Sequence, residues 1–94
     1  MMYIKKIDEY IVSIKSILAK LVPCEKTDGV EIDVANLTKT MEESIEKCDN
    51  EIFSACVYNA VATIKTAPRG CSVRQLVQSL EDAAGEMELM KEYL

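Results

Sequence analysis

The chain has 94 residues, of which 49% are hydrophobic and 29% are charged, and its formal net charge is −5. This length fits one domain covering 1–94, and an acidic chain without a basic helix face is a poor candidate for binding nucleic acid. Charges near the N-terminus argue against a signal peptide, and the uncharged run 52–64 is too short to span a bilayer. We therefore expect a cytoplasmic protein that is not inserted in a membrane.

Residues 2–22 are predicted to form an amphipathic helix. Their apolar side chains recur alternately three and four positions apart, which places them on one face, and Pro23 ends the helix. The seam consists of Ile4, Ile7, Ile11, Ile14, Leu18 and Leu21, widened on one flank by Tyr3, Tyr10 and Ile17.

A second helix is predicted over 34–49, after the turn signal Asp28-Gly29. Residues 30–34 alternate apolar and polar, which allows a short extended piece that could pair with its copy in a dimer. In the alternative interpretation, Asp33 is the N-cap and Ile32 packs against Leu37 as a hydrophobic staple. We favour the cap. The apolar face of the helix then consists of Leu37, Met41, Ile45 and Cys48.

The stretch 50–66 is the most apolar part of the chain, and its apolar side chains point in nearly every direction around a helix. No Gly or Pro separates it from the helix before it, and we favour one continuous or kinked helix from 34 to 66. A helix that is apolar on all sides needs neighbours on all sides, so we expect this chain to form a dimer or a higher oligomer. The predicted interface consists of Ile52, Phe53, Cys56, Val57, Val61 and Ile64.

The last helix is predicted over 72–93, after a break at Pro68 and Gly70. Ser72 is its N-cap, Gln75 closes a capping box, and Cys71 packs against Leu76 as a staple. Gly85 in its middle suggests close approach of another backbone, at Ala60 and Ala62. The apolar face repeats the spacing of the first helix and consists of Val73, Leu76, Leu80, Ala83, Met87, Met90 and Leu94. The predicted fold is an all-α bundle of three to four antiparallel helices.

Catalytic and metal-binding patterns are sparse. The chain has no histidine, so Ser-His and Cys-His pairs are impossible, and its four cysteines lack the spacing of a zinc site. We expect reduced thiols, two or more of them in the core, and we expect neither a metal, nor a cofactor, nor an enzyme activity.

One acidic motif suggests a known family. Glu42-Glu43-Ser44-Ile45-Glu46 resembles the E-E-x-x-E motif with which nucleotide pyrophosphohydrolases of the MazG type hold Mg²⁺. The resemblance implies a second motif, E-x-x-D, on the next helix, but residues 52–80 contain no acid. The second half of such a metal site is therefore missing, and an exposed acidic helix face explains the same residues.

A basic turn offers an alternative function. Lys65, Arg69 and Arg74 are the only charges within 52–80, and the helix that begins after Ser72 directs free N–H groups toward the same loop. A phosphate-bearing small ligand or nucleotide could bind there. The competing interpretation is that Lys65 complements a helix end and that the two arginines solubilise the turn.

A weaker alternative is a helix-turn-helix regulator over 57–80, which would present Ser72, Arg74, Gln75 and Gln78 to DNA. The acids of the last helix would repel phosphates and oppose it. The main functional prediction is a small acidic protein-protein interaction module, acting as an inhibitor, immunity-type protein or adaptor by stoichiometric binding and associating with itself.

Overall fold

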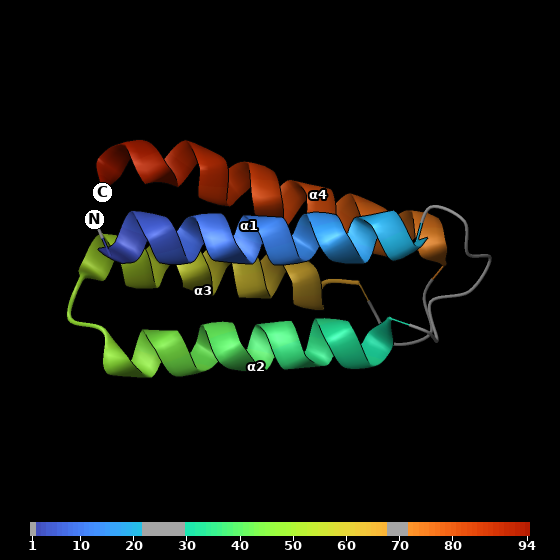
Figure 1. Cartoon of the computed structure of the whole chain (residues 1–94), viewed down its shortest axis with the longest axis horizontal. Coiled ribbons are helices and arrows are strands. Elements are labelled where there is room, and N and C mark those ends of the chain that lie inside the picture. The colour runs from blue at the N-terminus through green and yellow to red at the C-terminus, as the bar shows by residue number, and fades with distance from the viewer. Residues whose placement is uncertain (1, 22–29, 68–71) are drawn as a thin grey trace.

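The computed structural model describes residues 2–21, 30–67 and 72–94. It contains α1 (Met2–Leu21), α2 (Glu31–Lys47), α3 (Glu51–Lys65) and α4 (Val73–Met90), followed by a 3₁₀ turn, η1 (Lys91–Tyr93). Successive helices run in opposite directions along the long axis (Figure 1), and no strand occurs within the described ranges. The predicted all-α bundle is confirmed, with four helices.

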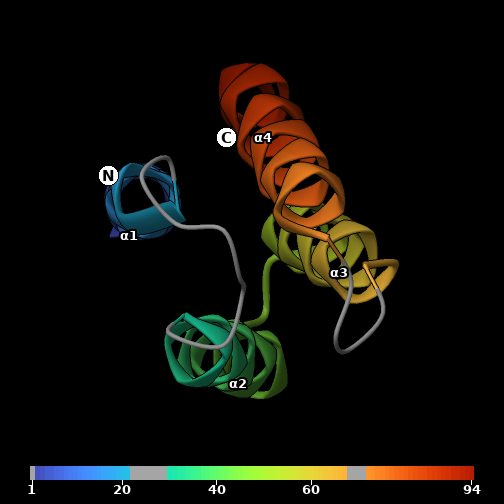
Figure 2. The ribbon, with the colours of Figure 1, turned by 90° about the vertical axis from the view of Figure 1, so that its right-hand side faces the viewer.

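The helices form a four-cornered bundle in which α1 lies diagonally opposite α3, and α2 lies opposite α4 (Figure 2). The α3 helix packs most extensively against α4 and also contacts α2. The α1 helix packs more extensively against α4 than against α2. The core lies between the four helices and draws on each of them. Its fully buried large side chains are Phe53, Ile7, Ile14, Leu21, Met41, Leu80, Met87, Val57 and Cys56.

The apolar seams of α1 and α4 face this core as predicted. In α1 the buried side chains include Ile7, Ile11, Ile14 and Leu21, and in α4 they are Leu76, Leu80, Ala83 and Met87. Side chains nearer the ends of the seams, such as Ile4 and Leu94, are half-buried. Spacing alone identified these two faces because burial on a straight helix follows its 3.6-residue period.

The prediction of one continuous or kinked helix over 34–66 was wrong. The α2 helix ends at Lys47, the backbone is extended at Cys48 (φ −99°, ψ 153°), and α3 begins at Glu51. Asn50 is the N-cap of α3, and its side-chain Oδ1 accepts a hydrogen bond of 2.9 Å from the backbone N–H of Phe53. This hydrogen bond satisfies a backbone N–H group at the start of α3, so the helix can begin here although no Gly or Pro precedes it. The α3 helix then folds back antiparallel to α2.

The predicted start of the second helix was also wrong. The α2 helix begins at Glu31 with Val30 as N-cap and no side-chain cap bond, so residues 30–34 are not extended. Asp33 lies within the first turn, where its carboxylate pairs with Lys20 of α1 at 2.9 Å. An acid in the first turn complements the helix dipole, and here it also ties α2 to α1.

The start of α4 matches its prediction. The Ser72 side chain accepts a bond from the backbone N–H of Gln75 at 3.2 Å, and Gln75 Oε1 accepts one from the backbone N–H of Ser72 at 3.1 Å. The predicted partner of the staple, Cys71, lies outside the described residues. The predicted close approach of another helix backbone to Gly85 does not occur among the described residues, because a Cβ added there would meet nothing within 4 Å. Ala60 is instead part of the core, and Ala62 is exposed.

A single chain covers most of the apolar surface of α3, although we expected that a second copy would be needed to cover part of it. Six of its side chains are buried by the other helices, namely Phe53, Cys56, Val57, Ala60, Val61 and Ile64. The side left open carries Tyr58, which is 65% exposed, together with small or polar residues such as Ala55 and Ala62. The radius of gyration of 12.8 Å is close to the ~12 Å expected for a compact domain of this length.

Among the described residues, no helix combines the length and the apolar character needed to cross a bilayer. The cysteines within the described ranges are free: Cys56 is buried and Cys48 is half-buried.

Candidate functional site

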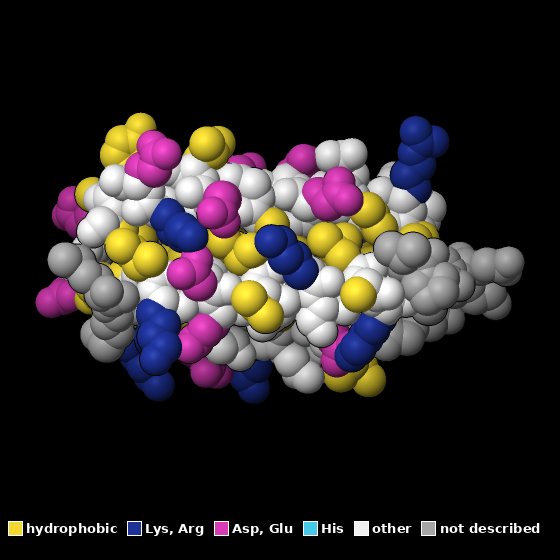
Figure 3. All heavy atoms as spheres, turned by 45° about the horizontal axis from the view of Figure 1, so that its top comes forward, with side chains coloured by type: hydrophobic (Ala, Val, Ile, Leu, Met, Phe, Trp, Pro, Cys, Tyr) yellow, Lys and Arg dark blue, Asp and Glu magenta, His cyan; other side chains and the backbone are white. Residues whose placement is uncertain are grey.

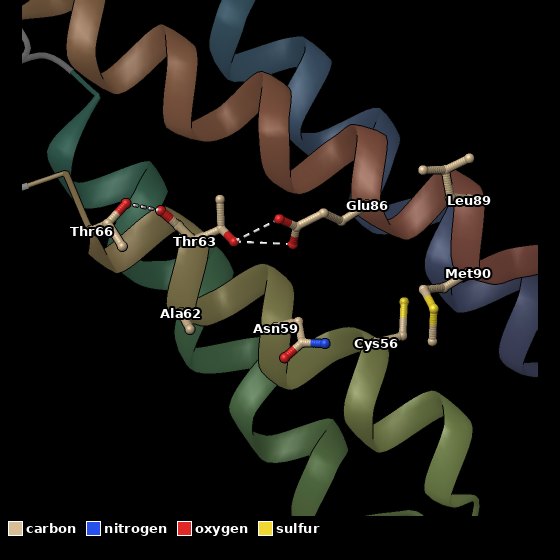
Figure 4. A pocket seen from close by; sticks show the side chains of 8 residues that line it. All are labelled: Cys56, Asn59, Ala62, Thr63, Thr66, Glu86, Leu89 and Met90. Carbon is tan, nitrogen blue, oxygen red and sulfur yellow. Dashed lines mark hydrogen bonds between the residues drawn. The ribbon is translucent and has the colours of Figure 1, made fainter.

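A groove runs between α3 and α4 on the outside of the bundle (Figure 4). Its volume is about 430 Å³. Four side chains of α3, its C-cap residue Thr66 and three side chains of α4 line it: Cys56, Asn59, Ala62, Thr63, Thr66, Glu86, Leu89 and Met90. The packing of α3 against α4 thus brings together residues that lie more than twenty positions apart in the chain.

The polar centre of this groove is a threonine-carboxylate pair. Thr63 Oγ1 donates across the groove to Glu86, with oxygen-oxygen distances of 3.1 and 3.0 Å to the two carboxylate oxygens (Figure 4). Glu86 is half-buried, and no cationic side chain among the described residues pairs with it. An ionised carboxylate accepts about four hydrogen bonds, so Glu86 retains acceptor capacity that the described part of this chain does not fill.

The apolar part of the groove is formed by Cys56 and Met90, whose sulfur-bearing side chains lie beside each other in Figure 4. Cys56 is 1% exposed. Burial raises the pKa of its thiol to about 11, and the negative charge of Glu86 adds to the rise. The thiol is therefore protonated at neutral pH and is a poor nucleophile. The groove is suited to binding rather than to thiol chemistry.

One exposed apolar side chain lines the groove, and two others lie four residues along the chain from lining residues. Leu89 lines it and is 70% exposed, and Tyr93, four residues later in η1, is 68% exposed. Ile52, one turn before Cys56 on α3, is 41% exposed. Hydrophobic side chains protrude near the C-terminal end of α4 in Figure 3, among acidic ones. These three residues, Leu89, Tyr93 and Ile52, are called the apolar rim below.

A second groove of about 560 Å³ lies between α1 and α2. Lys20 and Asp33 pair across one end of it, and the buried hydroxyl groups of Tyr10 and Ser44 are hydrogen-bonded to each other between the two helices. The hydroxyl of Thr40 donates to the backbone of its own helix. Several polar groups of this larger groove therefore already have partners within the chain.

The structure describes three of the four residues of the predicted anion site, which stays a prediction. Lys65 pairs with Glu42 of α2 at 2.5 Å, and the Ser72 side chain is engaged in the capping box. Arg74 is exposed on the first turn of α4, and Arg69 lies outside the described residues. Within the described ranges, no three Cys, Asp or Glu side chains come close enough together to hold a metal ion.

The predicted oligomer interface falls mostly inside one chain. Phe53, Cys56, Val57, Val61 and Ile64 are between 0% and 6% exposed, covered by the chain's own helices. Only Ile52 of the six reaches the surface. Self-association stays a prediction, but a surface that carries it would have to be formed by other residues.

Thr63, Glu86 and Leu89 were not among the site residues predicted from the sequence. One signal was available for Leu89: it is a large apolar residue that lies off the apolar seam of its helix, and Tyr93 shares this property. Such residues cannot contribute to the core when the seam does. Nothing in the local sequence indicates that Thr63 and Glu86 face each other.

Comparisons with protein-family models, curated proteins and solved structures found no match to this chain.

Proposed function

We propose that this chain is a small helical binding module that forms a stoichiometric complex with another protein through the groove between α3 and α4. Inhibitors, immunity-type proteins and adaptors act in this way. The observation that supports the proposal best is Leu89, which is 70% exposed beside a groove whose half-buried carboxylate, Glu86, has no cation among the described residues.

The physical reason for the proposal is the exposed apolar surface beside the groove, together with the low reactivity of its thiol. Large apolar side chains that surround a partly enclosed surface gain free energy when a partner covers them. Small residues such as Ala62 leave room for side chains of the partner, and the Cys56 thiol is protonated and buried. These features favour association over catalysis.

Two other functions receive less support. A phosphate-bearing ligand at residues 65–74 would have to compete with Glu42 for Lys65 and with the capping box for Ser72. A helix-turn-helix regulator would need a free recognition helix, but Gln75 serves the capping box and Gln78 donates to Asp82 at 2.8 Å.

The proposal is tested by placing a photo-cross-linking amino acid at position 89 and, as the matched control, at position 12. Val12 is 64% exposed on α1 and lines the groove between α1 and α2, so the two positions differ in the groove that they report on rather than in accessibility. Each variant is irradiated in an extract of the organism that encodes the chain, and the adducts are weighed by mass spectrometry. We expect one adduct of defined mass from position 89 that position 12 does not give.

The proposal fails if position 89 gives no adduct beyond those from position 12 and sedimentation shows a compact monomer. An adduct of twice the mass of the chain would identify the partner as a second copy.

A further inference from the structure

We propose that the occupant of the groove between α3 and α4 is an amphipathic helix of another protein that carries Lys or Arg beside its apolar ridge. This inference rests on the proposed function and specifies the chemistry of the partner. The apolar rim would take the ridge, and Glu86 would take the cation.

The shape of the groove fits a helix. Its lining runs along α3 from Cys56 to Thr66, which at the standard rise is about 15 Å, or about three helical turns. A helix presents apolar side chains at intervals of three and four residues, so three turns supply about three anchors. The apolar surfaces of Leu89 and Met90 lie at one end of this path, and Ala62 and Thr66 line the other part.

The charge in and around the groove favours a cationic partner, because Glu86 is the charged side chain among its described lining residues and the helix that carries it is acidic as a whole. Residues 73–93, which form α4 and η1, carry five acids against two bases, a balance of −3. Of the two bases, Lys91 is engaged by Asp8 at 2.5 Å and Glu88 at 3.3 Å, and Arg74 lies in the first turn of α4. A cation is therefore attracted to this surface, and an acidic partner is repelled.

Glu86 is the specific acceptor for that cation. Thr63 donates to both oxygens of its carboxylate and so fixes its orientation across the groove. A carboxylate that is half-buried loses part of its hydration, and the described part of this chain provides no cation in exchange. A partner ammonium or guanidinium group would supply the missing charge-assisted hydrogen bond.

A second copy of the chain fits this surface less well. Symmetric pairing through α4 would bring like surfaces together, and with them Asp82, Glu86 and Glu92 of both copies. Like charges across an interface oppose association. Self-association through the same groove is therefore an outcome that would overturn the inference.

The first test uses two synthetic helical peptides that share the same leucine ridge and carry either Lys or Glu on the flanking positions. Their affinities are measured by fluorescence anisotropy against the full chain. We expect the lysine peptide to bind with one-to-one stoichiometry and the glutamate peptide to bind at least tenfold more weakly, as expected for opposite charge patterns. Added salt should weaken binding of the lysine peptide, because salt screens the attraction between solvent-exposed charges.

Matched variants locate the contact. Glu86→Gln should weaken binding of the lysine peptide by roughly tenfold. Glu43→Gln, at an exposed position of α2, should leave that affinity unchanged. Leu89→Ser should weaken binding, and Val12→Ser should leave it unchanged. Equal binding of both peptides, or equal effects of the matched variants, would overturn the inference.

A second test uses the natural partner trapped from position 89. Its cross-linking yield should fall strongly in the Glu86→Lys background and in high salt. An adduct that forms equally well in that background would refute the cationic partner while leaving the proposed binding function intact. A dimer in sedimentation that Leu89→Ser dissociates would likewise replace the basic helix by a second copy. Absence of any specific adduct is instead the failure of the proposed function.

Discussion

Replacing Gly85 by alanine should stabilise the protein, even though glycine in the middle of a helix usually indicates a packing constraint. Gly85 lies within α4 and is exposed, and apart from its own turn of helix no heavy atom lies within 4 Å of the position where a Cβ would be placed. Its backbone is helical, which alanine adopts without strain. The substitution therefore adds a methyl group that meets only solvent.

The gain can be estimated from the unfolded and folded states. Alanine restricts the unfolded chain more than glycine does and has the highest helix propensity, so Gly85→Ala should raise the free energy of unfolding by about 1 kcal/mol. For a domain of this length, that corresponds to a rise in melting temperature of roughly 4–8 °C. No cavity is filled and no contact is lost, so the whole effect comes from the backbone.

Urea unfolding followed by circular dichroism measures the change, with thermal melting as a second readout. The midpoint should rise while the slope of the transition stays constant, because the surface exposed on unfolding is unchanged. The reciprocal variant Ala55→Gly, at an exposed position of α3, should lower the free energy of unfolding by a similar amount. A loss of stability in Gly85→Ala would refute the reasoning and would show that another chain packs against this glycine.

Three further predictions follow from the fold and the groove. Phe53→Ala should cost about 3–5 kcal/mol in urea unfolding because Phe53 is 0% exposed, whereas Tyr58→Ala, at 65% exposure, should cost less than about 0.5 kcal/mol; similar costs would contradict the core assignment. Asn50→Ala should cost about 1 kcal/mol by removing the N-cap of α3, and an unchanged thermal midpoint would count against the cap. With the other three cysteines replaced by serine, alkylation of Cys56 should stay slow at neutral pH and accelerate toward pH 11, and Glu86→Gln should move this rise to lower pH because a negative charge is removed. Since the folded pKa exceeds the ordinary value of 9.0, the contribution of this thiol to stability should be complete below pH 9 and be lost as pH rises through about 11, and Cys56→Ala should lack this loss.

The positions of the core were largely predictable, and those of the groove were not. The seams of α1 and α4 and the capping box at Ser72 depend on residues within one helical turn of each other, so local sequence contains the whole signal. A break near residues 49–50 was one of two interpretations of the sequence, and continuity was favoured because Asn50 is acceptable both in a helix and as its cap. Its role was decided by the antiparallel packing of α2 and α3, which requires the chain to turn there.

The apolar character of α3 correctly indicated that other helices cover it on most sides. It did not indicate that those helices belong to the same chain. Helical spacing does not indicate whether a buried face meets the same chain or another one, since both remove the same surface from water. The four-helix arrangement covers Phe53 and Val57 with residues of this chain.

The amino-acid sequence by itself determined the helical class, the faces that enter the core, the acidic charge and the absence of histidine, because each depends on composition or on short-range spacing. Only the tertiary structure decided that Thr63 and Glu86 face each other and that Leu89 lies exposed beside them. Those relations depend on the register between α3 and α4, which is set by the packing of all four helices together. A register of this kind involves residues more than twenty positions apart, and no local pattern encodes it.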